Sequence, residues 1–232
     1  MQRTLFTLAL VGGFLGLTSF VSAQTPAPAR YAKVLFLGNS ITKHGPKADI
    51  GWTGNWGMAA SGEDKDYVHL IVQGLTPAGG TPPQFFVNNI ADFERAYADY
   101  DLATKLKATA DFKADLIILA IGENVPALKT DAEKSLFQQQ VSKLLATLKA
   151  PGSNPTVVVR SCFWQNDAKD QALKAACSES GGTFVDISAL GKDEGNYARS
   201  ERPFKHEGVA RHPGDKGMKA IADAILKATP RG

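Results

Sequence analysis

The sequence predicts an α/β protein in which a five-stranded parallel sheet lies between two layers of helices, an α/β/α arrangement. Short apolar runs of β-prone residues, such as residues 34–37, lack the polar alternation of half-exposed strands, so they predict strands that are buried on both faces. Longer segments with helical spacing lie between these runs, and strand and helix alternate five times along the chain. This alternation favours right-handed crossovers and a single domain over residues 32–232.

Each expected element is bounded by turn-forming residues. The strands are expected over residues 34–37, 84–87, 115–121, 156–160 and 183–187. The helices are expected over residues 67–75, 93–107, 130–149, 167–180 and 215–228, with residues 58–61 as a further possible helix start. Thr130 and Glu133 form the pattern of a capping box. The apolar stripe of that helix is expected to comprise Leu136, Val141, Leu144, Leu145 and Leu148. Residues 191–211 have low periodicity and predict a loop.

Length and composition are ordinary for one soluble globular domain. The chain has 232 residues, of which 44% are hydrophobic and 21% are charged. The net charge of +3 is small and the basic residues are scattered, which argues against nucleic acid as a partner. No histidine and acid cluster has metal-ligand spacing, and no glycine-rich loop is followed by the Lys-Ser/Thr of a phosphate-binding loop. We therefore expect neither a metal nor a cofactor.

Residues 1–23 have the pattern of a signal peptide. Arg3 supplies the positive charge, residues 5–17 the apolar core, and residues 21–23 a small-x-small cleavage site before Gln24. An uncleaved anchor helix is the alternative. Cleavage would give a periplasmic or secreted bacterial protein with no membrane insertion. The proline-rich residues 24–31 predict a flexible spacer.

Three polar residues stand where a ligand of an open α/β sheet would bind, close to the carboxyl ends of strands. Ser40 follows the first predicted strand, Asn124 follows the third, and His212 comes just before the last predicted helix. Each residue also has an ordinary interpretation as a turn or cap former. Together, however, a hydroxyl, an amide donor and an imidazole are the groups that acyl transfer through a covalent ester requires.

The order and surroundings of these residues resemble the SGNH (GDSL-type) hydrolase family. The similar segments are Gly38-Asn39-Ser40-Ile41-Thr42, with Asn39 in place of the usual Asp, then Gly122-Glu123-Asn124, and finally His212-Pro213 with Gly217. The resemblance spans about residues 33–228. It implies a flavodoxin-like, three-layer fold. It also implies that Ser40 is the nucleophile, that His212 is the base, and that the Asn124 amide and the Ser40 backbone N–H bind the oxyanion.

Two other serine-enzyme patterns fit the sequence poorly. The segment around Ser40 is not a Gly-x-Ser-x-Gly elbow, which argues against an ordinary α/β-hydrolase. Ser40 and Lys43 match the Ser-x-x-Lys pattern of penicillin-recognising enzymes, but the chain has no Ser-Asp-Asn or Lys-Thr-Gly partner motif.

The sequence departs from the family pattern at the third member of the triad. The family usually has an Asp three residues before the histidine, and this chain has Val209 there. Glu207 is the expected substitute to orient the imidazole, and a backbone carbonyl is the alternative. Asp186 and Asp215 are weaker candidates, the latter being expected to cap the last helix.

A second departure is the missing glycine that donates to the oxyanion after the second strand in the family. Candidates for that donor are the backbone N–H groups of Ala91, Asp92 and Gly57. Of the remaining histidines, His206 is the rival base, His44 could line the site, and His69 is expected to be structural.

Two further pairs of residues allow alternative interpretations. Trp52 and Trp56 are either core residues or a lip that stacks on sugar rings beside Ser40. Export permits a disulfide between Cys162 and Cys177, whereas their expected positions, at a strand end and about ten residues into the next helix, argue against it.

The resemblance and the signal peptide together predict an exported serine esterase that cleaves small acyl groups, most simply acetyl, from a glycan or a small ester. An acyltransferase with the same acyl-enzyme is one alternative. A non-catalytic periplasmic glycan-binding protein is another, and the two departures from the family pattern motivate it.

Overall fold

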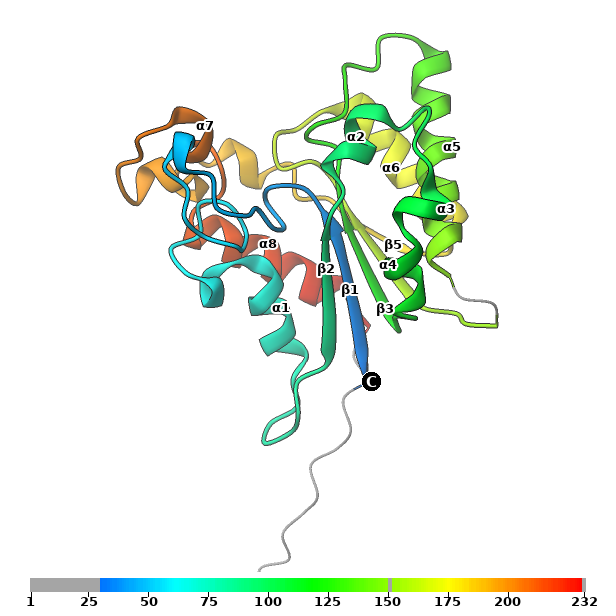
Figure 1. Cartoon of the computed structure of the whole chain (residues 1–232), viewed down its shortest axis with the longest axis horizontal. Helices are drawn as coiled ribbons and strands as arrows, with labels where there is room; N and C mark the ends of the chain where they lie inside the picture. The colour runs from blue at the N-terminus through cyan, green and yellow to red at the C-terminus, as the bar shows by residue number, and fades with distance from the viewer. Residues whose placement is uncertain (1–29, 150–151, 231–232) are drawn as a thin grey trace, which may run out of the picture.

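The computed structural model describes residues 30–149 and 152–230, and five parallel strands form one sheet within them (Figure 1). The strand order is β2-β1-β3-β4-β5. The strands are β1 (Lys33–Gly38), β2 (Gln84–Asn89), β3 (Leu116–Ala120), β4 (Thr156–Arg160) and β5 (Thr183–Val185). Every strand predicted from the sequence is confirmed, with ends that differ by no more than two residues. β1 has a neighbour on both sides, so Ser40, just beyond it, lies next to the ends of β2 and β3.

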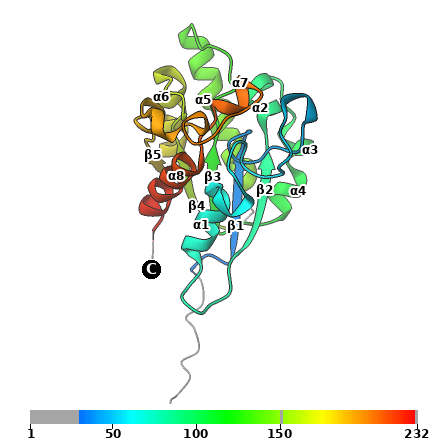
Figure 2. The ribbon, with the colours of Figure 1, turned by 90° about the vertical axis from the view of Figure 1, so that its left-hand side faces the viewer.

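Helices cover both faces of the sheet, as predicted (Figures 1 and 2). α1 (Tyr67–Leu75) and α8 (Asp215–Ala228) lie against one face, and α5 (Asp131–Leu148) and α6 (Asp167–Glu179) lie against the other. Successive residues of β1 alternate between two hydrophobic cores. Val34 and Phe36 pack with α1 and α8, whereas Leu35 and Leu37 pack with α5 and α6.

The prediction of one continuous helix over residues 93–107 is wrong. The segment forms three short helices, α2 (Ala91–Ala96), α3 (Leu102–Lys105) and α4 (Lys107–Asp111). Asp101 causes the break before α3, because its carboxylate accepts the Thr104 N–H at 3.1 Å and so caps a new helix. The break leaves α2 as a separate turn of helix beside the ends of β1 and β3, where it contributes to the site described below.

Other local predictions have mixed outcomes. The capping box of Thr130 and Glu133 is confirmed. Leu136 is wrong as a stripe residue, because it is 38% exposed and Phe137 is buried instead. Residues 58–61 do not begin a helix, and Ala59 has a φ of 73°. The loop predicted over residues 191–211 contains three 3₁₀ turns and the short helix α7 (Glu207–Ala210).

The two cysteines are free thiols, and both are buried. Cys162 follows β4 and Cys177 lies in α6. The structure therefore supports the interpretation without a disulfide.

The N-terminal boundary of the domain lies slightly earlier than predicted. The predicted signal peptide and residues 24–29 of the predicted spacer lie outside the described residues. Tyr31, the last residue of that spacer, is 4% exposed, and its hydroxyl donates to the Pro230 carbonyl at 3.0 Å. Tyr31 thus belongs to the folded domain. Among the described residues, no helix combines the length and the apolar character needed to cross a membrane.

Candidate active site

Ser40 lies on a tight turn at the carboxyl edge of the sheet. The turn is closed by the Asn39 carbonyl, which accepts the N–H groups of Thr42 and Lys43 at 3.0 and 2.9 Å. Gly38 is required at the strand end, because a Cβ there would overlap the Thr42 side chain and lie 2.9 Å from the Ala120 carbonyl oxygen. The Ser40 side chain is half-buried, and its backbone N–H has no hydrogen-bond partner among the residues that the structure describes.

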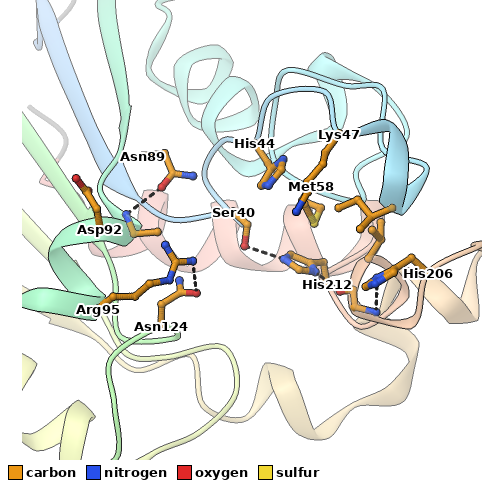
Figure 3. A pocket seen from close by; sticks show the side chains of 14 residues that line it. Ser40, His44, Lys47, Met58, Asn89, Asp92, Arg95, Asn124, His206 and His212 are labelled. Carbon is orange, nitrogen blue, oxygen red and sulfur yellow. Dashed lines mark hydrogen bonds between the residues drawn. The ribbon is translucent and has the colours of Figure 1, made fainter.

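His212 contacts Ser40 directly (Figure 3). The distance from Ser40 Oγ to His212 Nε2 is 2.8 Å, and the distance from His212 Nδ1 to the Gly208 carbonyl oxygen is 2.7 Å. A carbonyl oxygen can only accept, so Nδ1 carries the proton and Nε2 has the free lone pair. This tautomer lets the Ser40 hydroxyl donate to Nε2, which is the arrangement of a nucleophile and its general base.

The surroundings of His212 favour the neutral imidazole. Burial lowers the pKa of His212 to about 4, even though the Gly208 carbonyl and the Glu123 carboxylate act in the opposite direction. The Trp164 ring packs edge-on against the imidazole with the ring centres 5.5 Å apart. His212 is therefore able to accept a proton over the whole neutral range.

The prediction that Glu207 orients the imidazole is wrong. The Glu207 side chain is 72% exposed and lies 3.7 Å from Arg199. Glu207 is the first residue of α7, and the neighbouring Gly208 presents its carbonyl to His212 instead. The backbone carbonyl that was the alternative at this position is therefore the partner of His212.

Replacing Glu207 by glutamine is expected to change kcat and KM by less than about twofold, because an exposed surface ion pair contributes little. The measurement is ester hydrolysis by the Glu207→Gln variant beside the unchanged protein. A loss of a hundredfold or more in kcat would instead give the carboxylate the orienting role.

The other acidic candidates also lie away from the imidazole. Asp186 accepts the Ser188 N–H at 2.9 Å. Asp215 accepts the Ser61 N–H at 2.7 Å and does not cap α8. The first N–H groups of α8 are taken by Glu201, at 2.8 and 2.9 Å.

Asn124 lies across the cavity from His212, and its amide is held by two consecutive residues of α2. Asn124 Nδ2 donates to Glu94 Oε2 at 2.7 Å, and Arg95 Nη2 donates to Asn124 Oδ1 at 3.2 Å. Asn124 follows Gly122, whose φ of 125° is a conformation that other residues rarely adopt. The structure therefore brings Asn124 to the same cavity as Ser40 and His212, as predicted.

A buried polar network lies directly beneath these residues. Asn39 Nδ2 donates to both Glu94 Oε1 and Glu123 Oε2, at 3.1 and 2.6 Å. Arg160, which is fully buried, binds Glu123 Oε1 at 2.7 Å. Burial alone would raise the pKa of Glu123, but Arg160 holds it below its usual value. The amide at position 39, where the family usually has Asp, avoids adding a third carboxylate to this network.

Of the three proposed backbone donors to the oxyanion, two are already engaged. The Gly57 N–H donates to Asp66 at 3.0 Å, and the Ala91 N–H donates to the Asn89 side chain at 3.0 Å. The Asp92 N–H has no hydrogen-bond partner in the described part of the chain, which leaves it as the one open candidate of the three.

The residues converge on a cavity of about 590 Å³. Ser40, Asn124 and His212 line it together with His44 and His206, whereas Glu207 does not. The remaining lining residues are Lys47, Ile50, Met58, Asn89, Ala91, Asp92, Arg95, Gly208 and Val209. No group of three metal-ligating side chains occurs within residues 30–149 and 152–230.

His69, His206 and the Trp52–Trp56 pair have structural contacts. His69 Nδ1 lies 2.8 Å from an Asp66 carboxylate oxygen. His206 caps α7 by accepting the Gly208 N–H at 3.1 Å. Trp52 and Trp56 pack edge to face with their ring centres 5.7 Å apart and do not line the cavity. The structure thus supports the core interpretation of the tryptophans, and gives no support to a sugar-stacking lip.

Sequence reasoning missed Glu94, Arg95 and Gly208. Glu94 lies within the helix predicted over residues 93–107, where a charged residue carries no sign that it will be fully buried. Gly208 acts through its backbone carbonyl, which every residue has. Only the position of Gly208, four residues before His212, hinted at such a contact.

Comparison with known proteins shows which fold this is. No protein-family model matches the chain, and no curated protein sequence does. Solved structures do match. A protein described as a GDSL-like lipase from Bacteroides uniformis aligns over 85% of this chain and 95% of its own, with 14% identity and a TM-score of 0.52. The chain therefore has the fold of the SGNH (GDSL-type) hydrolases.

Two further structures match with the same TM-score of 0.52. A Bacillus subtilis protein is 16% identical over 87% of this chain and 56% of its own. A carbohydrate esterase is 10% identical over 88% of this chain and 65% of its own. Similarities at this level of identity establish the fold alone, so the activity has to be argued from the site.

Proposed function

We propose that this protein is a serine esterase that cleaves short acyl groups, most simply acetyl, from a carbohydrate. The observation that carries the proposal is the contact of 2.8 Å between Ser40 Oγ and the unprotonated nitrogen of a histidine whose other nitrogen binds the Gly208 carbonyl. A structural serine would not require a buried imidazole with that tautomer. The carbohydrate esterase that shares the fold supports the choice of substrate.

The geometry supports the following mechanism. His212 Nε2 takes the proton of Ser40 as Oγ attacks the ester carbonyl, which forms a tetrahedral intermediate. The Ser40 N–H and the Asn124 amide stabilise the negative charge on its oxygen. His212 then gives the proton to the sugar oxygen as its bond to the acyl carbon breaks, and the sugar leaves with a free hydroxyl. A water molecule, deprotonated by the same nitrogen, attacks the acyl-serine; the bond to Ser40 Oγ breaks, Oγ takes that proton back from His212, and the carboxylic acid leaves.

The lining of the cavity favours a small acyl group on a polar alcohol. Most of the lining residues are polar or charged, and only Ile50, Met58, Ala91 and Val209 are apolar. A long acyl chain gains its binding energy from apolar surface, about 0.8 kcal/mol for each buried methylene. The apolar side chains here are Ala91 and one cluster of Ile50, Met58 and Val209, so the apolar part of the lining is confined to a few residues.

The test is hydrolysis of p-nitrophenyl acetate, butyrate and octanoate, followed by acetate release from acetylated xylan and mannan. We expect kcat/KM to fall as the acyl chain lengthens, and acetate to be released from at least one glycan. No hydrolysis of any ester, together with no labelling of Ser40 by a serine-directed organophosphonate, would contradict the proposal and favour a glycan-binding protein. Labelling without hydrolysis would favour an acyltransferase.

The pH dependence of activity gives an independent test of the base. His212 must be neutral to accept a proton, and its pKa is lowered to about 4, so activity should be lost only as the pH falls through that low value. We expect the acid limb of kcat/KM to have its midpoint below about pH 5, whereas an ordinary histidine would give about 6.5. Circular dichroism at each pH serves as the control for folding. An acid limb centred near pH 6.5 would contradict the burial of the base.

We also propose export to the periplasm or the medium. The support is the pattern of residues 1–23. N-terminal sequencing of the protein recovered from those fractions should begin at Gln24, and an intact Met1 would contradict the proposal.

A further inference from the structure

We propose that Glu94 and Arg95 of α2 are positioning residues, which together hold the Asn124 amide in the orientation that stabilises the oxyanion. The proposal rests on the proposed esterase function and adds two residues to its machinery. It also accounts for how the site is supported in a chain without the family's glycine donor.

Two residues of α2 set the orientation of the Asn124 amide. Glu94 Oε2 lies 2.7 Å from Asn124 Nδ2, and Arg95 Nη2 lies 3.2 Å from Asn124 Oδ1. A carboxylate only accepts hydrogen bonds and a guanidinium only donates them. A rotation of the amide by half a turn would place its oxygen against the carboxylate and its NH₂ group against the guanidinium. Two attractive contacts would become repulsive, so α2 specifies one orientation.

This orientation leaves one N–H of the Asn124 amide without a partner in Glu94 or Arg95. The NH₂ group of Asn124 has two hydrogens, and Glu94 takes one of them. The other is left for a ligand in the cavity that Asn124 lines with Ser40 and His212 (Figure 3). The Ser40 N–H is likewise unpartnered within the described residues. The site therefore has two donors, contributed by the loops after β1 and β3.

Glu94 also connects the two loops that carry these donors. Glu94 Oε1 accepts the Gly122 N–H at 2.6 Å and Asn39 Nδ2 at 3.1 Å. Asn39 precedes Ser40, and Gly122 lies two residues before Asn124. One buried carboxylate thus connects the loop of the nucleophile to the loop of the amide donor. An oxyanion site acts through preorganised donors, so this connection should matter in the transition state more than in substrate binding.

The contacts of Glu94 also argue that its carboxylate, and not merely its shape, is needed. Burial and the nearby Glu123 carboxylate raise the pKa of Glu94, but every hydrogen bond it makes is accepted from an N–H group of Asn39, Gly122 or Asn124. The ionised form satisfies all these donors. A glutamine would turn its own NH₂ group towards at least one of them.

Arg95 provides the more easily tested half of the pair. Its side chain is exposed at the cavity and forms no salt bridge with a carboxylate in the described part of the chain. Its hydrogen bond is made to the neutral Asn124 amide. Replacing an exposed residue of this kind should leave the fold intact, which keeps the proposal testable even if Glu94 variants fail to fold.

The experiment compares Arg95→Met, Arg95→Lys, Glu94→Gln and Asn124→Ala on p-nitrophenyl acetate. We expect Asn124→Ala to lower kcat by about 100- to 1,000-fold, as loss of one oxyanion donor does elsewhere. Arg95→Met should lower kcat by about tenfold with KM almost unchanged, and Arg95→Lys should recover part of the loss. Glu94→Gln should fall between Arg95→Met and Asn124→Ala. Lys105→Met, which removes an exposed cation from neighbouring α3, is the control and should match the unchanged protein.

A double variant decides whether Arg95 acts through Asn124. If it does, Arg95→Met combined with Asn124→Ala should be no slower than Asn124→Ala alone. If the losses of the two single variants multiply in the double variant, the proposal is overturned. A change of Arg95→Met that is confined to KM would also overturn it. Either result would give Arg95 a separate contact with substrate. Normal kcat in Arg95→Met, beside a Ser40→Ala variant that is inactive, would overturn this inference and leave the esterase proposal standing. Equal rates for Ser40→Ala and the unchanged protein would instead overturn the esterase itself.

Discussion

Replacing Ser40 by alanine or His212 by glutamine is expected to lower kcat by about 10⁴- to 10⁶-fold, the range seen when a nucleophile or its base is removed from a serine hydrolase. The two side chains act as one unit, because Ser40 Oγ is activated only through its 2.8 Å contact with His212 Nε2. The double variant should therefore be no slower than either single variant. The measurement is single-ester hydrolysis at neutral pH by the four purified proteins.

Matched controls separate this expectation from a loss of folding. Ser178→Ala removes an exposed hydroxyl from α6, and His69→Gln removes a histidine that lies outside the cavity. Both should retain full activity. His206→Gln tests the rival base and should retain most of it, since His206 Nδ1 is occupied by the Gly208 N–H. Activity that survives in His212→Gln and is lost in His206→Gln would show that His206 is the base.

The largest effect on stability is expected at Arg160. Its guanidinium is fully buried and lies 2.7 Å from the Glu123 carboxylate, whose side chain is only 3% exposed. Arg160→Met would leave that carboxylate buried without a cation and close to Glu94. Breaking such a pair on one side costs about 3–5 kcal/mol in the free energy of unfolding. Urea denaturation of the purified protein, with the slope of the transition compared between variants, measures the difference.

The companion variants test the cause. Glu123→Gln combined with Arg160→Met removes both charges, so it should be more stable than Arg160→Met alone. Arg199→Met removes an exposed ion pair with Glu194 and should have little effect. An Arg160→Met protein as stable as the unchanged one would mean that the Glu123 carboxylate is protonated or hydrated, and the buried charge pair would have to be abandoned.

The contrast between α5 and the segment after β2 shows where sequence-based prediction succeeded. In α5 a capping box and a regular apolar stripe agreed, and the helix forms with its predicted start. Residues 93–107 also have helical spacing, yet Asp101 competes as a cap and divides the segment. Local patterns therefore predicted elements such as α5, where local preference and tertiary packing agree. They missed the break before α3, which depends on capping by the Asp101 side chain.

The residues of the site likewise include some that local sequence patterns could predict and some that they could not. Ser40, Asn124 and His212 could be predicted, because the end of a buried strand and the start of a helix are visible as local patterns and their chemistry depends on residue type. Glu207 was the natural choice for the third member because it is acidic and close in sequence. The structure assigns the contact to the Gly208 carbonyl, which no side-chain pattern can reveal.

The sequence by itself determined the α/β class, the five parallel strands and the three polar residues at the strand-end edge. These features depend on the order of apolar and polar residues along the chain, which is local information. Only the tertiary structure decided that Glu94 is buried beneath Asn124, that Arg160 neutralises Glu123, and that α2 holds the amide. Those contacts join residues 29 to 37 positions apart, and their energies come from burial and from the loss of water around charges. Such energies exist only once the chain has folded around the charges.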